Sequence, residues 1–524
     1  MPEQAPERRP LILVRGFGGL GIEDERRIAY QGFNDGTVYP QKRGENYIYE
    51  GMVLRFLKAG WDYYDATNVV GYYQKPITDS AKIPDELKDL PAQIFSGDSI
   101  VVDPGMALHL HQTVADLRRT IWVFRYYDLE RGKFSVYGLA LKRLIDLIRQ
   151  LARLKHPDQE PPKVNIIAHS MGGLIVREAI QVTYPDANKK AEDHIHKVVT
   201  LGTPHKGISF QVVKNWIALE AEQELERFNP DFQKSDNKAS AINFHEHFPL
   251  ERLLCVVGTN YRSYGIRPAS WMNRFFSVSE EFGLNYNRSD GLVKQELAQI
   301  DGAPRTFVHK CHGGEDSLVT SREAFEIATR FFFGDIRVRL RLKEARVLRG
   351  KDRFGKSEYF FGVSIKPRGV DFDLFHQSPE AENCYGPFSN QDLSDPKVAF
   401  DWAGPGRLIW EGWLDTSRIM EDKSRTGKEI VMRLDFYVGE RDLLGVGFSD
   451  NVIFRGQYYV RAVLPRSGQP SLYRHENEDF VDKEVRLQAK DRMDEEPGGW
   501  SFQISGTGFE ATLSVELERL AAPS

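Results

Sequence analysis

The run from residue 165 to 176, NIIAHSMGGLIV, constrains this chain more than any other segment. Apolar residues before Ser170 predict a short buried strand, and the amphipathic residues after it predict a helix. Ala168 and Gly172 are small enough for a sharp turn that pushes the serine hydroxyl out of the sheet edge. The alternative is a serine that only caps the helix, with glycines that serve packing. The strand before the serine and the helix after it favour a nucleophile elbow.

Three further segments fit the same architecture. Residues 11–19 predict an apolar strand that ends in a glycine-rich turn, and residues 198–207 predict another strand that runs into a loop. Residues 289–293 then place Asp290 in a turn, and two histidines follow before the amphipathic segment 322–333. The order of glycine-rich strand, serine, aspartate and histidine is that of α/β-hydrolases, and it differs from the orders in the two common serine-protease folds.

The segments LVRGFGG, AHSMGG, LGTPHKG and SDGLV resemble those of bacterial lipases and of the related α/β-hydrolases of the GPI inositol-deacylase type. The resemblance covers roughly residues 11 to 334 and, with the histidine loop, includes five motifs in order. It implies an α/β-hydrolase fold and esterase-like chemistry. It also implies that Ser170 is the nucleophile, that Asp290 is the acid of a triad and that a histidine after it is the base.

The same resemblance implies an oxyanion hole built from two backbone N–H groups, those of Phe17 and Met171. The family usually has a histidine before Gly16, where this chain has Arg15. Because a backbone donor does not depend on that side chain, we expect the oxyanion hole to be retained. The role of Arg15 itself stays open.

His309 and His312 are the two candidates for the base. A catalytic histidine is expected on a loop after the last strand, and residues 305–309 resemble the end of that strand whereas residues 311–314 resemble the loop. His312 also follows Asp290 by 22 residues, a spacing typical of the lipase pattern. His312 is therefore favoured, with His309 interpreted as a structural histidine at a strand edge.

Asp290 competes with Asp301 and Asp316 for the role of the acid. It lies in a Ser-Asp-Gly turn after a core strand, where a carboxylate can be held rigidly enough to orient an imidazole. Asp316 is closer to His312 in the sequence but would have to fold back on it. Asp290 is therefore the favoured acid.

Size, charge and cysteine content set further limits. A chain of 524 residues is longer than one core of usual size, so we expect two domains. A net charge of −5 and an isoelectric point near 6.3 give no electrostatic basis for binding nucleic acid. Three scattered cysteines do not indicate a disulfide framework. The N-terminus lacks an apolar signal region, and no window has the ~20 consecutive apolar residues of a spanning helix. We therefore expect a soluble protein in the cytoplasm, with export by a signal-independent route as the alternative.

Residues 11–334 alternate apolar strands with helical segments, for example 121–127 followed by 137–154. This alternation predicts a mostly parallel sheet with helices on both faces, with ligands bound beyond the carboxyl ends of the strands. Two insertions interrupt the pattern, at about 20–118 and 208–248.

The second insertion begins with an amphipathic stretch that contains Trp216. In lipases this region often forms a lid over the serine, which would bring Trp216 to the substrate. The alternative is a helical excursion that only buries its own apolar face.

From residue 336 onward the hydrophobic period switches to two, the pattern of half-buried strands. Seven or eight such segments, separated by turn signals, predict that residues 335–524 form an all-β sandwich-like domain or a partly open barrel. Lipases of other kinds carry sandwich modules that bind lipid surfaces, so peripheral membrane contact is one hypothesis. An adaptor or dimerisation module is the other.

Metal binding is not expected. The pairs His109/His111 and His194/His196 would ligate a metal only if both rings lay on one strand face, and no cysteine or carboxylate stands at ligand spacing. The acidic segment 369–373 is a weak candidate for a calcium loop, because six to eight oxygen ligands cannot be assembled around it. We therefore expect neither a metal nor another cofactor.

These features predict hydrolysis of a carboxylic ester through an acyl-enzyme. The aromatic residues between 61 and 73, together with the Trp216 segment, suggest an apolar acyl pocket that favours lipid or other long-chain esters over peptides. One alternative is a catalytically inactive hydrolase-fold scaffold whose sandwich binds a partner. Another is an amide or thioester hydrolase, because the same triad serves all three bonds. The sequence leaves the oligomeric state open.

Overall fold

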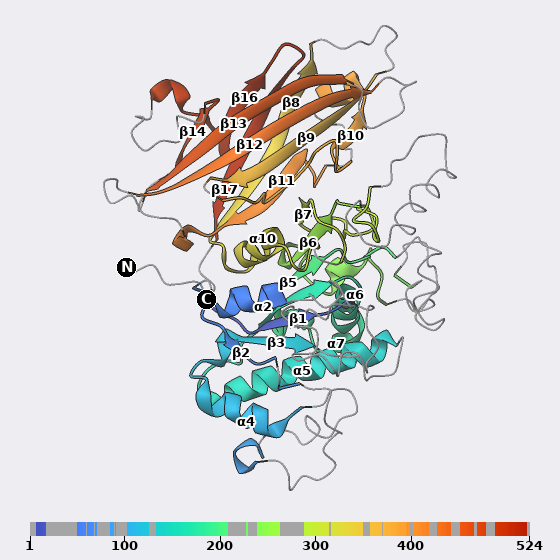
Figure 1. Cartoon of the computed structure of the whole chain (residues 1–524), viewed down its shortest axis with the longest axis vertical. Helices are drawn as coiled ribbons and strands as arrows, with labels where there is room; N and C mark the ends of the chain where they lie inside the picture. The colour runs from blue at the N-terminus through green and yellow to red at the C-terminus, as the bar shows by residue number, and fades with distance from the viewer. Residues whose placement is uncertain are drawn as a thin grey trace, which may run out of the picture.

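The computed structural model has two halves stacked along the long axis of the molecule, an α/β half and an all-β half (Figure 1). The structure describes residues 7–16, 50–58, 60–67, 69–70, 84–88, 90, 102–124, 133–207, 227–228, 238–261, 288–313, 316–348, 357–368, 370–395, 397, 402–418, 427–441, 451–465, 469–477 and 488–520.

A seven-stranded parallel sheet forms the N-terminal half. Its strands lie in the order β2-β3-β1-β4-β5-β6-β7, so β1 lies inside the sheet, with β3 and β2 on one side and β4 to β7 in sequence order on the other. The strands are β1 (Leu11–Val14), β2 (Tyr64–Asp65), β3 (Thr120–Phe124), β4 (Val164–His169), β5 (Ile195–Leu201), β6 (Leu253–Gly258) and β7 (Arg305–Val308).

Helices cover both faces of this sheet. Alternate residues of β1 belong to different apolar clusters: Ile12 and Val14 pack with α4, α5 and α6, whereas Leu11 and Leu13 pack with α2 and α10. The mostly parallel sheet predicted from the sequence is confirmed. The helices are α2 (Glu50–Leu57), α4 (Pro104–Thr113), α5 (Phe134–Lys155), α6 (Met171–Glu178) with its continuations η5 (Ala179–Thr183) and α7 (Tyr184–Asp186), and α10 (Arg322–Phe333).

Short 3₁₀ turns connect these elements: η3 (Asp85–Leu87), η4 (Leu117–Arg119), η6 (Ala191–Asp193), η8 (Phe244–Glu246) and η9 (Leu250–Arg252). None of the described helices is long and apolar enough to cross a membrane.

The positions of Trp61 and Tyr63 in the first insertion contradict part of the predicted acyl pocket. Trp61 packs against Phe333 with ring centroids 4.9 Å apart, and Tyr63 packs against Phe56 at 5.4 Å. Both side chains are buried in the core beside α10. Trp61 and Tyr63 therefore fill the α/β core and do not line an acyl pocket, whereas Tyr72 and Tyr73 lie outside the described residues.

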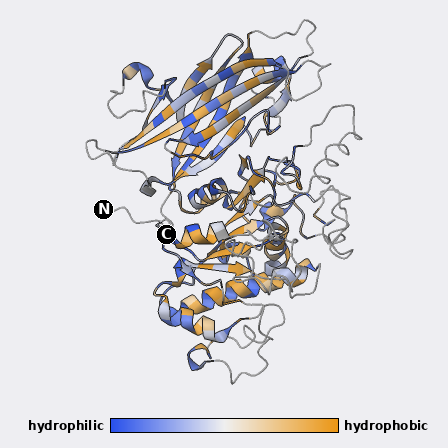
Figure 2. Ribbon diagram, viewed as in Figure 1, coloured by the Kyte–Doolittle hydropathy of each residue, from blue (hydrophilic) through white to orange (hydrophobic). Residues whose placement is uncertain are grey.

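Two five-stranded antiparallel sheets form the C-terminal half, in the orders β10-β9-β12-β13-β14 and β11-β8-β17-β16-β15. Their strands alternate hydrophobic and hydrophilic residues, whereas the parallel sheet is hydrophobic along its strands (Figure 2). Phe509 of one sheet contacts Phe361 and Phe454 of the other, so the two sheets pack face to face as the sequence predicts. The strands are β8 (Ile336–Val347), β9 (Glu358–Pro367), β10 (Tyr385–Phe388), β11 (Leu408–Leu414), β12 (Gly427–Arg441), β13 (Asn451–Pro465), β14 (Ser471–His475), β15 (Asp494–Glu496), β16 (Gly499–Ser505) and β17 (Phe509–Arg519), with the short helices α11 (Asn390–Ser394), η10 (Thr416–Arg418) and η12 (Ala489–Asp491).

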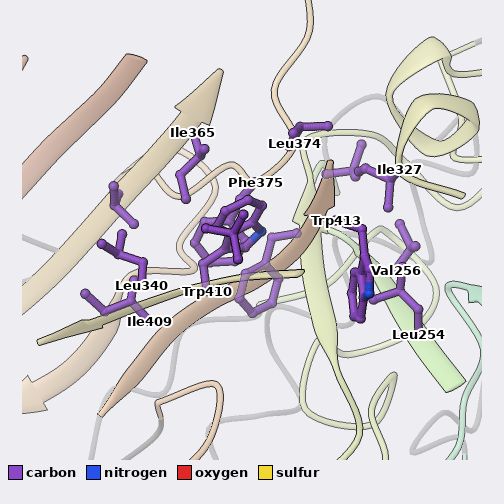
Figure 3. Packing of buried hydrophobic residues seen from close by; sticks show 14 of the residues in the cluster. Leu254, Val256, Ile327, Leu340, Ile365, Leu374, Phe375, Ile409, Trp410 and Trp413 are labelled. Atoms are coloured by element: carbon purple, nitrogen blue, oxygen red, sulfur yellow. The ribbon is translucent and has the colours of Figure 1, made fainter. Parts of the chain in front are cut away.

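One apolar cluster continues across the junction between the two halves (Figure 3). Trp413 of β11 meets Phe331 of α10 edge to face, with ring centroids 4.6 Å apart. Leu254 and Ile327 on the α/β side line the same small cavity as Trp410 and Trp413. The switch to period two after residue 334 suggests a separate core, but the two halves share this cluster.

A short segment between β9 and β10 also joins the two halves through the backbone. The N–H of His376 donates to the carbonyl of Phe307 in β7 at 3.0 Å, and Ile365 of β9 exchanges bonds with the same segment. This segment, residues 374–376, therefore covers the free edge of the parallel sheet, which would otherwise expose unpaired backbone groups.

Candidate active site

Ser170 occupies a strained turn between β4 and α6. Its φ is 53° and its ψ is −129°, a conformation that non-glycine residues rarely adopt. The turn is held by the backbone N–H of Ser170, which donates to the carbonyl of Leu201 on β5 at 2.9 Å. The sharp strand-to-helix turn expected from the sequence is thus present at this serine.

Position 172 requires glycine because the start of α6 lies directly against the end of β1. A Cβ at this position would lie 2.5 Å from the carbonyl oxygen of Val14 and 2.6 Å from that of Arg15. A side chain there would force the helix away from the sheet, so the small residue of the A-x-S-x-G pattern is a packing requirement.

Ser170, His312 and Asp290 lie in one hydrogen-bonded chain. The Ser170 Oγ lies 2.9 Å from His312 Nε2, and His312 Nδ1 lies 2.8 Å from Asp290 Oδ2. The exposed fractions of these residues fall from 9% at the serine to 4% at the histidine and 1% at the aspartate. With Nδ1–H donating to the carboxylate, Nε2 is left to accept the serine proton. The structure therefore brings together three residues that stand 142 and 22 positions apart in the sequence.

The Asp290 carboxylate is fixed by its own turn. Its Oδ1 accepts hydrogen bonds from the backbone N–H groups of Leu292, at 3.0 Å, and Val293, at 2.8 Å. The backbone N–H of His312 donates to the carbonyl of Asp290 at 2.9 Å, so the two loops are joined through backbone as well as side chain. Gly202, with a φ of 56°, leaves room here, because a Cβ would lie 2.8 Å from Asp290 Oδ2.

His169 is a site residue that the sequence reasoning missed. Its Nε2 donates to the backbone carbonyl of His312 at 2.9 Å, and the two rings lie with centroids 4.8 Å apart. Burial lowers the pKa of His169 well below its ordinary value; the charges of His312 and Arg15 act in the same direction, and the hydrogen bond to the His312 carbonyl opposes them. A neutral His169 therefore supports the loop that carries His312. Its place in the AHSMGG motif, directly before the serine, was the available signal.

Two further candidates bear on the oxyanion hole. Met171 is the first residue of α6, so its N–H lacks a partner within the helix and can serve a ligand. Phe17 lies outside the described residues. Gly16, just before it, lies against the serine, since a Cβ there would be 2.8 Å from that of Ser170. Arg15 is buried, and its charge acts on His169.

His309, the other candidate for the base, and Asp301 and Asp316, the other candidates for the acid, bind residues outside the Ser170–His312–Asp290 chain. His309 Nδ1 lies 3.1 Å from the hydroxyl of Thr259, and its ring packs on that of His376. Asp301 is exposed and pairs with a lysine at 2.6 Å, and Asp316 pairs with Lys310 at 2.7 Å.

Arg177 of α6 is a second residue that the sequence reasoning missed. It is 1% exposed and donates to the backbone carbonyls of His205, at 2.5 Å, and Ala239, at 2.9 Å. Burial lowers the pKa of Arg177 to about 9, which still leaves it charged at neutral pH. It therefore fixes the LGTPHKG loop after β5 and the end of the second insertion to the helix behind the serine.

The predicted lid and its Trp216 cannot be placed, because residues 208–226 and 229–237 lie outside the described ranges. The described remainder includes Phe244 and Phe248, which are buried in the α/β core.

Within the described ranges, no group of three or more His, Cys, Asp or Glu side chains could hold a metal. His109 and His111 lie on helix α4, not on a strand, and His196 on β5 bonds Asn165 at 3.1 Å. In the acidic segment, Asp373 pairs with a histidine at 2.9 Å. The cysteines are free and buried.

The comparisons with known proteins bear on the fold of the N-terminal half. Residues 108–272 match the family model of the PGAP1-like alpha/beta domain. The chain has an α/β-hydrolase fold. This confirms the resemblance and the fold class predicted from the sequence.

Similar solved structures include the Bacillus licheniformis lipase BlEst2 in its mature form and the phospholipase PlaB from Legionella pneumophila. The first is 14% identical over 63% of this chain and 95% of its own, with a TM-score of 0.29. The second is 12% identical over 63% of this chain and 83% of its own, with a TM-score of 0.25. No curated protein matches the sequence.

Proposed function

We propose that this protein is a serine hydrolase that cleaves carboxylic esters through an acyl-enzyme. The observation that carries the proposal is the chain Ser170 Oγ–His312 Nε2, at 2.9 Å, and His312 Nδ1–Asp290 Oδ2, at 2.8 Å, at the strained turn. A serine on such a turn, a histidine within hydrogen-bond reach and a buried carboxylate that orients the imidazole are the parts that nucleophilic catalysis needs.

In the acylation step, Ser170 Oγ attacks the ester carbonyl carbon while its proton passes to His312 Nε2. The carbonyl π electrons move to oxygen and form a tetrahedral oxyanion. When this intermediate collapses, the C–O bond to the alcohol breaks and the alcohol oxygen takes the proton from His312. Asp290 holds the imidazole in the required tautomer and stabilises its charged form throughout.

In the deacylation step, water attacks the acyl carbon and gives one proton to His312. Collapse of the second tetrahedral intermediate breaks the bond to Ser170 Oγ, which recovers that proton, and releases the carboxylic acid. No cofactor enters either step.

The oxyanion is assigned to the backbone N–H groups of Met171 and Phe17. The position of Met171 at the start of α6 and the close contact between Gly16 and Ser170 support this assignment. In serine hydrolases the loss of one such donor costs about 3–4 kcal/mol of transition-state stabilisation.

The substrate class proposed is a lipid-like acyl ester, on the resemblance of the motifs to those of bacterial lipases. We propose residues 11–334 as the catalytic domain and residues 335–524 as a second, sandwich domain. Residues 208–248, with Trp216, are the candidate lid and substrate contact. Peripheral contact with a lipid surface belongs to the same proposal.

The test is hydrolysis of a series of esters and phospholipids with increasing acyl length by the wild-type protein and Ser170→Ala. We expect turnover that rises with chain length and is lost in Ser170→Ala, because alanine fits the turn but supplies no nucleophile. Activity on amides or thioesters alone would replace the ester as the assigned substrate bond but would leave the assignment of the triad unchanged. A folded wild-type protein without turnover on any of these bonds would favour the scaffold alternative.

A further inference from the structure

The acid of the proposed triad lies in a small closed loop, residues 288–295. The backbone N–H of Gln295 donates to the carbonyl of Arg288 at 2.8 Å and closes the base of the loop. Ser289 and Lys294 form the next bridge, and the N–H of Asp290 donates to the carbonyl of Val293 at 3.2 Å. A shift at the base of this loop is therefore transmitted to the Asp290 carboxylate.

Both residues at the base of the loop bind the β-sandwich. The side-chain amide of Gln295 donates from Nε2 to the carbonyl of Ala381 at 3.2 Å, and Arg288 donates from Nη2 to the carbonyl of Gly386 at 3.4 Å. Gln295 is 4% exposed, so its bond is shielded from water. The sandwich thus contacts the acid loop at the two positions that close it.

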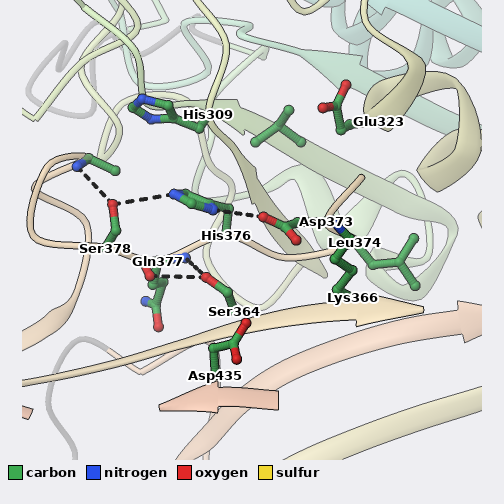
Figure 4. A network of polar contacts seen from close by, with 12 residues as sticks. His309, Glu323, Ser364, Lys366, Asp373, Leu374, His376, Gln377, Ser378 and Asp435 are labelled. Atoms are coloured by element: carbon green, nitrogen blue, oxygen red, sulfur yellow. Dashed lines mark hydrogen bonds and ion pairs between the residues drawn. The ribbon is translucent and has the colours of Figure 1, made fainter. Parts of the chain in front are cut away.

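The acceptor on the sandwich side is itself rigid. The N–H of Ala381 donates to the hydroxyl of Ser378 at 3.2 Å, and the side chain of Asn383 donates to the carbonyl of His376 at 2.6 Å. Gln377 ties this loop to β9 by accepting from the N–H of Val363 at 3.2 Å. The same loop carries the polar network of Figure 4, in which His376 lies between Asp373 and Ser378.

We propose that the β-sandwich positions the catalytic acid, with Gln295 as the positioning residue that connects the two. The inference rests on the proposed function, since it assigns Gln295 a role in the geometry of Asp290 and His312. The sandwich is then a working part of the active site and not only an appended module. A displacement near 1 Å at a group far from the reacting atoms is enough to lower turnover by up to ~100-fold.

The test compares two single substitutions, each of which removes one hydrogen bond between the halves. Gln295→Leu removes the bond to Ala381. Thr306→Val is the matched control, because the Thr306 hydroxyl donates to the carbonyl of Leu374 at 2.7 Å, away from the acid loop. Each change leaves one buried carbonyl without that donor, so the two should lower the thermal midpoint by similar amounts.

We expect Gln295→Leu to lower kcat on a soluble ester roughly tenfold or more with little change in KM, whereas Thr306→Val stays within about twofold. We also expect the acid limb of the rate profile of Gln295→Leu to move to lower pH, because a carboxylate held less firmly stabilises an imidazolium less. Equal losses of kcat in the two variants, or an unchanged rate profile, would reduce Gln295 to a residue that only joins the two halves.

A second measurement does not depend on turnover. Hydrogen–deuterium exchange over residues 288–295 reports the N–H groups of Leu292 and Val293 that bind the carboxylate. Faster exchange in Gln295→Leu than in Thr306→Val supports the proposal, and equal exchange overturns it. If Gln295→Leu does not fold, Arg288→Met replaces it at the half-buried end of the loop, with the same expected directions.

Failure of the proposed function is recognised separately. If the wild-type protein turns over no ester, amide or thioester, or if Ser170→Ala retains the activity, the assignment of the triad fails. The exchange comparison still decides whether the sandwich holds the loop.

Discussion

Ser170 shows how this chain stores local strain at one residue. A non-glycine residue in such a conformation costs on the order of 1–3 kcal/mol and persists only where its surroundings over-determine it. Here the surroundings are the bond to Leu201 and the close contact of Gly172 with the end of β1. These contacts hold the strained turn, and the turn places the Ser170 hydroxyl within hydrogen-bond distance of His312.

Gly172→Ala tests this contact. We expect the added methyl group, which would lie 2.5 Å from the Val14 carbonyl oxygen, to destabilise the fold by about 1–3 kcal/mol and to abolish ester hydrolysis. Thermal unfolding and turnover measure the two effects. Gly105→Ala, in the exposed first turn of α4, is the control and should have a much smaller effect, because among the described residues a Cβ there would lie 3.2 Å from a single side-chain atom, Asp103 Oδ1, and close to no backbone of another element. Full activity in Gly172→Ala would mean that the turn is not tightly determined.

The two histidines near the end of β7 are predicted to differ sharply. We expect His312→Ala to lose as much kcat as Ser170→Ala, because residues of a triad act as a unit. His309→Ala removes only the contacts with Thr259 and His376 and should stay within a few-fold of wild type. Steady-state kinetics on one soluble ester decides between them. An inactive His309→Ala with an active His312→Ala would contradict the geometry.

At the scale of elements, the sequence was most informative where function depends on short segments. The strand, turn and helix around Ser170 and the turn at Asp290 are encoded by neighbouring residues, so their positions could be predicted. The contacts of His169 and Arg177 could not, because their partners, His312 and Ala239, come from distant loops. The hydrogen bond from Gln295 to Ala381 could not be predicted either, because it depends on how the α/β half packs against the sandwich, and no local sequence pattern specifies that packing.

Two half-buried histidines, His194 just before strand β5 and His196 on it, make the stability of the fold depend on pH. Burial, with the nearby cations Arg9, Lys197 and Arg252, lowers the pKa of His196 to about 2. Below its ordinary value near 6.5 the unfolded chain binds a proton that the folded chain does not, so stability is lost as the pH falls from about 6.5. His194 acts in the same direction, since burial lowers its pKa to about 4.

We therefore expect the thermal midpoint to fall between pH 7 and pH 5, and His196→Asn to flatten this dependence. Differential scanning calorimetry over that range measures both. The control is His109→Asn, on the exposed face of α4, which should leave the slope unchanged. A midpoint that rises on acidification would contradict the burial of these rings.

At the scale of the whole molecule, the two halves are coupled in three ways. They share an apolar cluster around Phe331 and Trp413, a backbone segment along β7, and the bonds to the acid loop. The period-two pattern after residue 334 reveals the all-β half but carries no information on this coupling.

Truncation after Gly334 is expected to give an insoluble or unfolded protein, because it uncovers the face of α10 that Trp413 covers. Within the full chain, Trp413→Ala should cost about 3–5 kcal/mol of stability. Soluble expression and chemical denaturation are the measurements. A truncated chain that stays folded and keeps wild-type turnover on soluble esters would show that the sandwich is dispensable for both stability and catalysis.

The central claim is that Ser170 is an activated nucleophile, and the most direct measurement is covalent capture of that residue. We expect a fluorophosphonate probe to label the native protein once, with the adduct mapped by mass spectrometry to the peptide that contains Ser170. Labelling should disappear in Ser170→Ala and slow strongly in His312→Ala. An adduct on another residue, or no adduct on a folded protein that hydrolyses esters, would contradict the account.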